Sequence, residues 1–238
     1  MKRKLMLVAL WLSVRGVMTE PVFAQQVSQL IQESKTDRMS LAPGAVIHID
    51  GSFGDLNIEG WNQQDVEITV IKTLPYDYKQ SKAAKDMSAV KVTTEKKSDK
   101  ELDISTTVAT HDNWFLPITK SGTDMLIEYQ IHAPRDSKLV IHHGDGSVIV
   151  NNMAADIDAD SNKGDLIVML PDPASRLVDA RTRFGIIASD FGETHRARFI
   201  GETLLNGKRS SSPLVHLRMG RGGITLKTQP AEAYTAEQ

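Results

Sequence analysis

Apolar and polar residues alternate with a period of two through most of the chain after Ala45. Residues 45–73, AVIHIDGSFGDLNIEGWNQQDVEITVIKT, show this alternation around three glycines, which predicts short strands joined by tight turns. Residues 89–108 predict a hairpin with its charged turn at 95–100, and residues 125–143 predict two strands on either side of Pro134. The pattern therefore indicates an all-β protein.

Two segments lack this alternation. Residues 77–88 contain two alanines and no period of two, and they predict the one short helix of the chain. Residues 25–44 are polar with few apolar positions, which is typical of a linker with at most one or two helical turns.

A glycine followed by β-branched or leucine residues at every second position recurs along the chain. The units are FGDLNIEG (53–60), GDGSVIVNN (144–152), KGDLIVMLP (163–171), FGIIASDFG (184–192) and RGGITLKT (221–228). Gly144, Gly164 and Gly185 are 20 and 21 residues apart, and Gly223 follows after 38 residues, close to two periods. A recurrence near 20 residues predicts stacked coils, that is, a β-solenoid-like repeat with an antiparallel N-terminal portion.

A stack of coils leads to two local predictions. Val148 and Ile167 are expected to point into the core, so that an Asp at either position would unfold the protein. In the Gly-Asp pairs, the glycine is expected to supply a positive φ at a corner, and the aspartate to accept hydrogen bonds from the backbone N–H groups that follow it.

The order of these segments is similar to that of a known family. A G-D-L-x-I-x-G-W unit (54–61) precedes a V-x-I-x-V strand (66–70), a short helix and a Y-x-I-x-A-P strand (129–134), and the repeated glycine units follow. The chain thus resembles, over residues 45–228, the exported bacterial β-strand-repeat family named "putative adhesin", whose motifs are short and permissive. The resemblance implies a β-solenoid-like fold and a cell-envelope location, and it transfers no catalytic residue.

The N-terminus is typical of an exported protein. Basic residues 2–4, an apolar run at 5–14 and Val-Phe-Ala at 22–24 predict a signal peptide cleaved before Gln25. The apolar run is shorter than the roughly 20 residues that a spanning helix needs. The chain contains no cysteine, which excludes disulfides, thiolate chemistry and a lipidated cysteine. We expect export to the periplasm or cell surface, no transmembrane segment, and the following organisation: signal peptide 1–24, linker 25–44, "putative adhesin"-like β-repeat domain 45–228 and flexible tail 229–238.

The acidic stretch DIDADSNKGDLIVMLPD (156–172) raises three possibilities: a calcium loop, catalytic carboxylates or one unit of the repeat. An EF-hand register fails because Lys163 or Ser161 stands where glycine is required, and Met169 or Ile167 where a glutamate is required. On a strand, Asp156, Asp158 and Asp160 would share one face at steps of about 6.5–7 Å, a spacing compatible with paired glycosidase carboxylates. Because Ile157 and Ala159 occupy the other face, we expect the aspartates to face water and to keep ordinary acidity.

Charge is distributed unevenly. Residues 25–170 carry 14 basic and 22 acidic side chains, whereas residues 171–228 carry 10 basic, eight of them arginine, and 5 acidic. Candidate polyanion-binding residues are the pairs Arg181 and Arg183, and Arg196 and Arg198, since an i, i+2 pair shares one strand face and guanidinium groups bind phosphates and carboxylates. The alternative is a solvated face that keeps the sheet soluble. The apolar residues 114–116, within the segment 111–122, predict a lid over an open end of the stack, with a contact patch as the alternative.

No P-loop, G-x-S-x-G or H-E-x-x-H motif occurs, and the histidines show no metal-binding spacing. The sequence therefore predicts a non-catalytic envelope or surface protein of "putative adhesin" type, with no cofactor and no metal, which binds through exposed strand faces. The expected partners are an anionic envelope polymer, lipid headgroups or an envelope protein, and not nucleic acid. The alternatives are a carbohydrate-active β-helix enzyme that uses Asp156, Asp158 or Asp160, and an accessory subunit of an envelope assembly.

Overall fold

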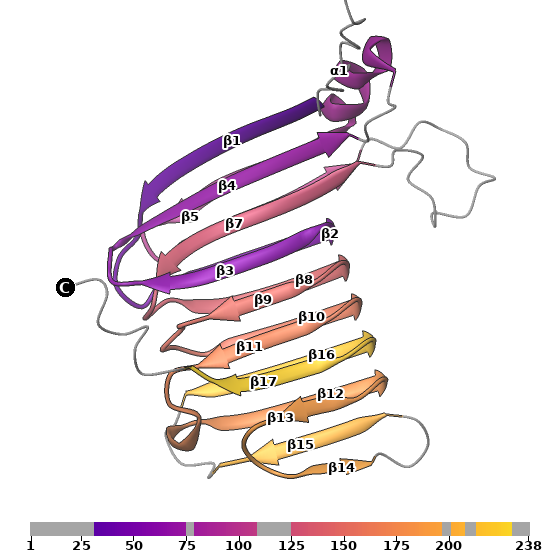
Figure 1. Ribbon diagram of the computed structural model, residues 1–238. Helices are drawn as coiled ribbons and strands as arrows, with labels where there is room; N and C mark the ends of the chain where they lie inside the picture. Colours follow the sequence, from indigo (N-terminus) through magenta and orange to yellow (C-terminus); the bar gives the residue numbers. More distant parts are fainter. Residues whose placement is uncertain (1–30, 75–78, 109–124, 197–200, 208–212, 230–238) are drawn as a thin grey trace, which may run out of the picture.

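Two β-sheets packed face to face form the protein (Figure 1). The computed structural model describes residues 31–74, 79–108, 125–196, 201–207 and 213–229. The first sheet contains, in spatial order, β1 (Ile31–Ser40), β4 (Asp65–Leu74), β7 (Leu126–Pro134), β3 (Asp55–Trp61), β9 (Val148–Asn151), β11 (Leu166–Leu170), β17 (Ile224–Thr228) and β13 (Ile187–Ser189). The second sheet contains β14 (Thr194–Arg196), β15 (Glu202–Asn206), β12 (Leu177–Phe184), β16 (Leu214–Arg221), β10 (Ile157–Lys163), β8 (Lys138–Asp145), β2 (Val46–Phe53), β6 (Glu101–Val108) and β5 (Val90–Ser98).

The prediction of an all-β protein is confirmed. Besides the strands, the described residues contain the helix α1 (Gln80–Ala89) and a 3₁₀ turn, η1 (Pro173–Ser175). The predicted helix at 77–88 is therefore present, with its start shifted to Gln80. Strands β5 and β6 form the predicted hairpin, although pairing continues to Ser98 and Glu101, which leaves a tighter turn than the predicted 95–100.

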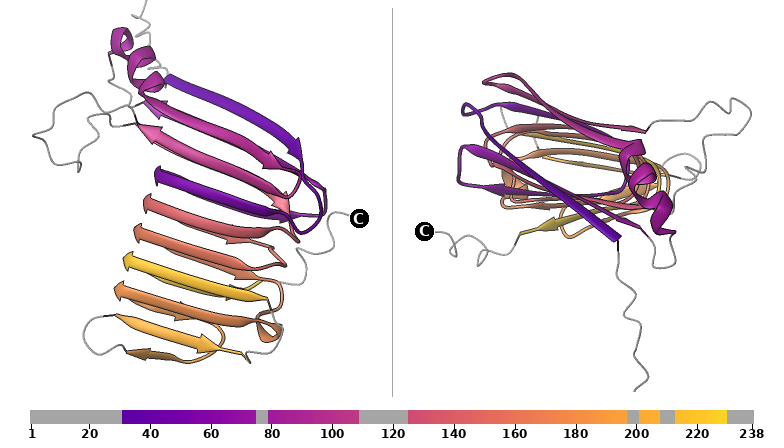
Figure 2. Two further views of the ribbon diagram at one scale, coloured as in Figure 1. Left: turned by 180° about the vertical axis from the view of Figure 1, so that it is seen from behind. Right: turned by 90° about the horizontal axis from the view of Figure 1, so that it is seen from above.

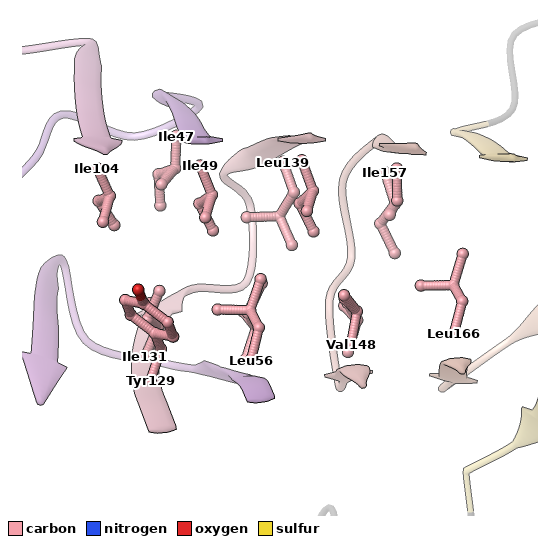
Figure 3. Close-up of a cluster of buried hydrophobic side chains, with 14 of the residues drawn as sticks. Ile47, Ile49, Leu56, Ile104, Tyr129, Ile131, Leu139, Val148, Ile157 and Leu166 are labelled. Carbon is pink, nitrogen blue, oxygen red and sulfur yellow. The ribbon is translucent and has the colours of Figure 1, made fainter. Parts of the chain in front are cut away.

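Alternating side chains fill the space between the sheets. In β10, Ile157 and Ala159 are buried while Asp158 and Asp160 are exposed, as the period of two requires. The apolar core runs the length of the molecule, and Figure 3 shows Ile47 and Leu139 of one sheet pointing toward Leu56 of the other. Seen along the long axis, the sheets form two stacked layers (Figure 2, right).

The centre of each sheet is parallel and the ends are antiparallel. Strands β2, β8, β10, β16 and β12 pair in parallel in one sheet, and β3, β9, β11, β17 and β13 do so in the other. Strands β1 and β4 close one end with antiparallel pairing, and β15 and β14 close the other. The predicted antiparallel N-terminal portion is thus present, and a second antiparallel segment follows β12.

Glycines form the corners where the chain passes from the nine-stranded sheet to the eight-stranded sheet. The five corner glycines, with φ from 110° to 150°, are Gly54, Gly146, Gly164, Gly222 and Gly185. The corners lie directly on one another, because a Cβ on Gly164 would stand 2.0 Å from the carbonyl oxygen of Gly146. Corner backbones also bond one another, as when Gly164 N–H donates to the carbonyl of Arg221 at 3.1 Å.

Two details of the predicted corners differ in the structure. Gly144 lies within β8, and the corner is Gly146; likewise the C-terminal corner is Gly222 rather than Gly223. Two of the aspartates that follow the corners accept hydrogen bonds from the backbone beside a neighbouring corner. Asp55 Oδ1 accepts from the N–H of Ser147 at 2.9 Å, as Asp165 Oδ1 does from Gly223 at 3.1 Å.

The strand pairs joined by the glycine corners do not follow one another in the order of the sequence. The pair β16–β17, which is last in the chain, lies between β10–β11 and β12–β13. The near-even spacing of the glycine units along the chain does not correspond to this spatial order. Between β12–β13 and β16–β17 in the chain lies β15, which pairs antiparallel with β12.

Two further predictions are wrong. Residues 31–40 were predicted to belong to a linker, but they form β1, an edge strand paired along its whole length with β4. Ile167 was predicted to be interior, but Leu166, Val168 and Leu170 are the buried residues of β11 and Ile167 lies on the outer face. Val148 is fully buried, as predicted. The predicted signal peptide, the segment 111–122 and the tail from 230 onward lie outside the described residues.

Candidate functional site: the outer face of the nine-stranded sheet

Charged residues form rows across the outer face of the nine-stranded sheet. In-register pairing puts Asp158 of β10 beside His216 of β16, and His216 beside Asp179 of β12. One step along the strands, Asp160 stands beside Arg218, and Arg218 beside Arg181. Successive residues of each strand point to opposite faces of the sheet. Each row of outward-facing residues is therefore followed, one residue along the strands, by a row that faces the core.

The aspartates of β10 occupy this face, as predicted. Asp158 and Asp160 are exposed, and Asp156 accepts a hydrogen bond from the N–H of Leu214 at 2.8 Å. Asp158 Oδ1 lies 2.8 Å from His216 Nδ1. Asp158 and Asp160 are open to water, so the row lies on an exposed strand face and not in an enclosed site.

Two of the four candidate arginines lie on the same face. Arg181 and Arg183 are exposed at alternate positions of β12. Arg181 Nε is 3.3 Å from Asp179 Oδ1, and the same carboxylate receives two hydrogen bonds from Arg218, at 3.2 and 2.9 Å. Burial would raise the pKa of Asp179, but the hydrogen bond and positive charge of Arg218 outweigh it and lower that pKa. Asp179 therefore fixes two guanidinium groups side by side.

The second arginine pair is placed only in part. Arg198 lies outside the described residues, and of Arg196 only the backbone is described, in β14. Strand β15 separates β14 from β12. On β15, Arg181 pairs with Thr203 and Arg196 pairs with Glu202. Because Thr203 and Glu202 are consecutive residues of one strand, the two backbone positions belong to opposite faces of the sheet.

A groove of about 490 Å³ lies at the other end of this face, over β5, β6, β2 and β8. Its charged lining residues are His48, Asp50, Glu95, Lys97, Glu101, Asp103 and His142. One potential ligand atom of His48, one of Glu101 and one of Asp103 lie within 4.8 Å of one another. Of the described residues, these three are the group that could hold a metal ion.

Lys97 supplies the positive charge in this groove. Its Nζ is 3.2 Å from Asp103 Oδ2 and 4.0 Å from a carboxylate oxygen of Glu95. The hydrogen bond to Asp103, followed by the charge of Glu95, raises the pKa of Lys97 above its ordinary value. The outer face is therefore acidic at the groove and carries its arginines at the far end.

Sequence analysis missed the groove because its residues come from separate segments. His48 and Asp103 are opposite each other in the parallel pair β2 and β6, although 55 positions separate them in the chain. Histidine spacing along the chain contains no information on such a pairing. The alternation around each residue could have shown that all three face outward, but not that they meet.

No helix within the described ranges has the length and apolar character needed to cross a membrane.

No family model matches the sequence, and no curated protein does. A "putative cell adhesion protein" from Clostridium sporogenes aligns with a TM-score of 0.50 and 13% sequence identity, covering 83% of this chain and all of that one. A "putative adhesin" from Parabacteroides distasonis aligns over 82% of this chain and 70% of its own with a TM-score of 0.25 and 12% identity. At 13% identity, the likeness to the Clostridium protein shows a common fold and nothing further.

Proposed function

We propose that this chain is a non-catalytic, exported envelope or surface protein of the "putative adhesin" type. Its binding surface is the outer face of the nine-stranded sheet, and the arginine end of that face binds an anionic envelope polymer or lipid headgroups. The observation that carries the proposal is the arrangement around Asp179, which holds Arg181 and Arg218 together on an exposed strand face, with Arg183 two residues from Arg181. Clustered guanidinium groups bind phosphates and carboxylates through paired N–H donors.

The fold supports this role. We infer that the parallel coils with stacked glycine corners form a β-solenoid-like scaffold, which presents long rows of side chains at fixed spacing. Export by a signal peptide ending at Ala24 belongs to the same proposal. The likeness to the Clostridium sporogenes protein agrees with a scaffold of this kind. The exposed aspartate row of β10 gives no support to the carbohydrate-active alternative.

Binding to anionic surfaces tests the proposal. The purified chain is mixed with vesicles of anionic phospholipid, with neutral vesicles and with lipopolysaccharide, and the bound fraction is measured by sedimentation at low and at physiological salt. We expect binding to the anionic samples only, weakened by salt because exposed charges are screened over about 8 Å at physiological ionic strength. Absence of binding to every anionic sample at low salt would contradict the proposal.

Paired variants locate the binding surface. Arg181→Gln with Arg183→Gln should weaken binding several-fold, while replacement of both by Lys should give an intermediate result, because charge is kept and the planar fork is lost. The matched control is Lys82→Gln with Lys85→Gln, which removes the same charge from exposed positions of α1, at the opposite end of the molecule (Figure 1). Equal loss in both variants would show that net charge, not this surface, governs binding.

A further inference from the structure

The groove between β5 and β8 holds an imidazole and two carboxylates in an arrangement suited to a metal ion. Glu101 and Asp103 are alternate residues of β6 and share its outer face, and His48 of β2 is opposite Asp103. Parallel pairing fixes these three backbone positions relative to one another. The ligand-bearing groups therefore meet on rigid strands and not on a loop.

The distances fit a first-row metal better than a direct hydrogen bond. His48 Nε2 is 3.6 Å from Glu101 Oε1, which is longer than a hydrogen bond. Two ligand atoms bound to one tetrahedral zinc at about 2.0–2.1 Å are about 3.3 Å apart. The remaining ligand atoms lie within 4.8 Å, and the His48 and Glu101 side chains, 42% and 50% exposed, can make the small rotation that closes this gap.

The charge in the groove favours a cation. Asp50, Glu95, Glu101 and Asp103 line it against the single cation Lys97. The ammonium group of Lys97 already contacts Asp103 and Glu95. The acidic cluster thus attracts a positive charge in the unliganded protein, and three carboxylate charges remain uncompensated when the histidines are neutral.

We propose that the groove binds a divalent cation of the zinc class through His48 Nε2 and one oxygen each of Glu101 and Asp103. Water completes the coordination, so that the metal keeps an open position toward the groove. Imidazole among the ligands selects zinc and its first-row neighbours over magnesium and calcium, which prefer oxygen ligands alone. Lys97 competes with the metal for Asp103 and must turn away when the metal binds. This proposal does not depend on the polyanion-binding function.

Isothermal titration of the tag-free chain with zinc tests the site, with magnesium and calcium as comparison ions. We expect one zinc-dependent binding event that His48→Gln or Asp103→Asn weakens about tenfold or more, because each removes one of three ligands. His216→Gln is the matched control, since it removes another histidine of the outer face, which is half-buried and lies 2.8 Å from Asp158 Oδ1. That variant should bind zinc as the unmodified chain does.

A variant with the opposite effect sharpens the test. Lys97→Gln removes the competing ammonium group and should tighten zinc binding several-fold. Cobalt substituted for zinc reports the ligands directly, because its visible absorption depends on its coordination. This absorption should be lost in His48→Gln. Far-ultraviolet circular dichroism of the same variant checks that the fold is retained. Undetectable zinc binding, equal affinity of the unmodified and His48→Gln chains, or weaker binding by Lys97→Gln would each overturn the proposal.

Discussion

The inner and outer faces of the nine-stranded sheet are built by the same strands in the same register, yet they carry opposite chemistry. On the inner face, rows such as Ile47, Leu139 and Ile157 are fully buried against the other sheet. On the outer face, the adjacent row runs from His48 through Val140, Asp158 and His216 to Asp179. Stability therefore resides in the inner rows, and the outer rows are free to carry recognition chemistry, because exposed charged pairs contribute little to folding.

The largest expected effect separates the inner and outer faces of the eight-stranded sheet, whose strands alternate in the same way. Val148→Asp should destabilise the protein by more than about 4 kcal/mol, because it places an unpaired charge in the core. Ile167→Asp, on the outer face of the neighbouring strand β11, should cost about 1 kcal/mol. Chemical denaturation of the two variants measures the difference, and similar losses would show that the assigned faces of these strands are incorrect.

Corner glycines should rank next. Gly164→Ala should cost about 3 kcal/mol or more, because its φ of 124° is unfavourable for alanine and the new Cβ would meet the Gly146 carbonyl. Gly44→Ala is the control: its φ is also positive, at 70°, but no heavy atom lies within 4 Å of the added Cβ. We expect a cost of about 1 kcal/mol there. Equal melting temperatures of the two variants would show that corner stacking contributes nothing.

Asp179→Asn tests a charged contact on the outer face, and its effect should depend on pH. The lowered pKa of Asp179 means that its ionised form stabilises the folded state. This contribution is complete at a pH above about 3.8, the pKa of an aspartate in the unfolded chain. It is lost as the pH falls through the lower pKa that Asp179 has in the folded protein. The variant should be less stable by about 1 kcal/mol at pH 7. Denaturation curves of the two proteins should converge at the acidic end, and a constant difference across pH would refute the assignment.

The smallest effect is expected at Asp158. Asp158→Asn leaves a hydrogen-bonding group beside His216 on an exposed surface, so stability should change by a few tenths of a kcal/mol. Added calcium should leave the melting temperature unchanged, because the acidic stretch 156–172 lacks the glycine and glutamate that an EF-hand loop requires. A calcium-dependent rise of several degrees would show instead that the acidic stretch binds the ion.

Local pattern determined much of what the sequence predicted correctly. Alternation in β10 placed Asp158 outside and Ala159 inside without knowledge of any partner strand, because successive side chains of a strand point in opposite directions. Positive φ at Gly54 and Gly164 followed from the same local logic, since glycine tolerates conformations that other residues avoid. The pattern gave the wrong face for Ile167 in the run LIVML (166–170), because an uninterrupted apolar run does not indicate which face is buried.

What only the tertiary structure decided is the choice of neighbours. Any strand pair with an apolar edge can cover any other, so the glycine spacing could not show that β16–β17 lies between β10–β11 and β12–β13. Pairing of β2 with β6 likewise brings His48 to Glu101 and Asp103, and pairing of β1 with β4 converts an apparent linker into an edge strand. The direction of a side chain depends on its position within two residues of sequence, whereas the partner of a strand depends on the burial summed over the whole molecule. The sequence pattern by itself therefore determined which face of a strand each residue occupies. The tertiary structure decided which residues meet on that face.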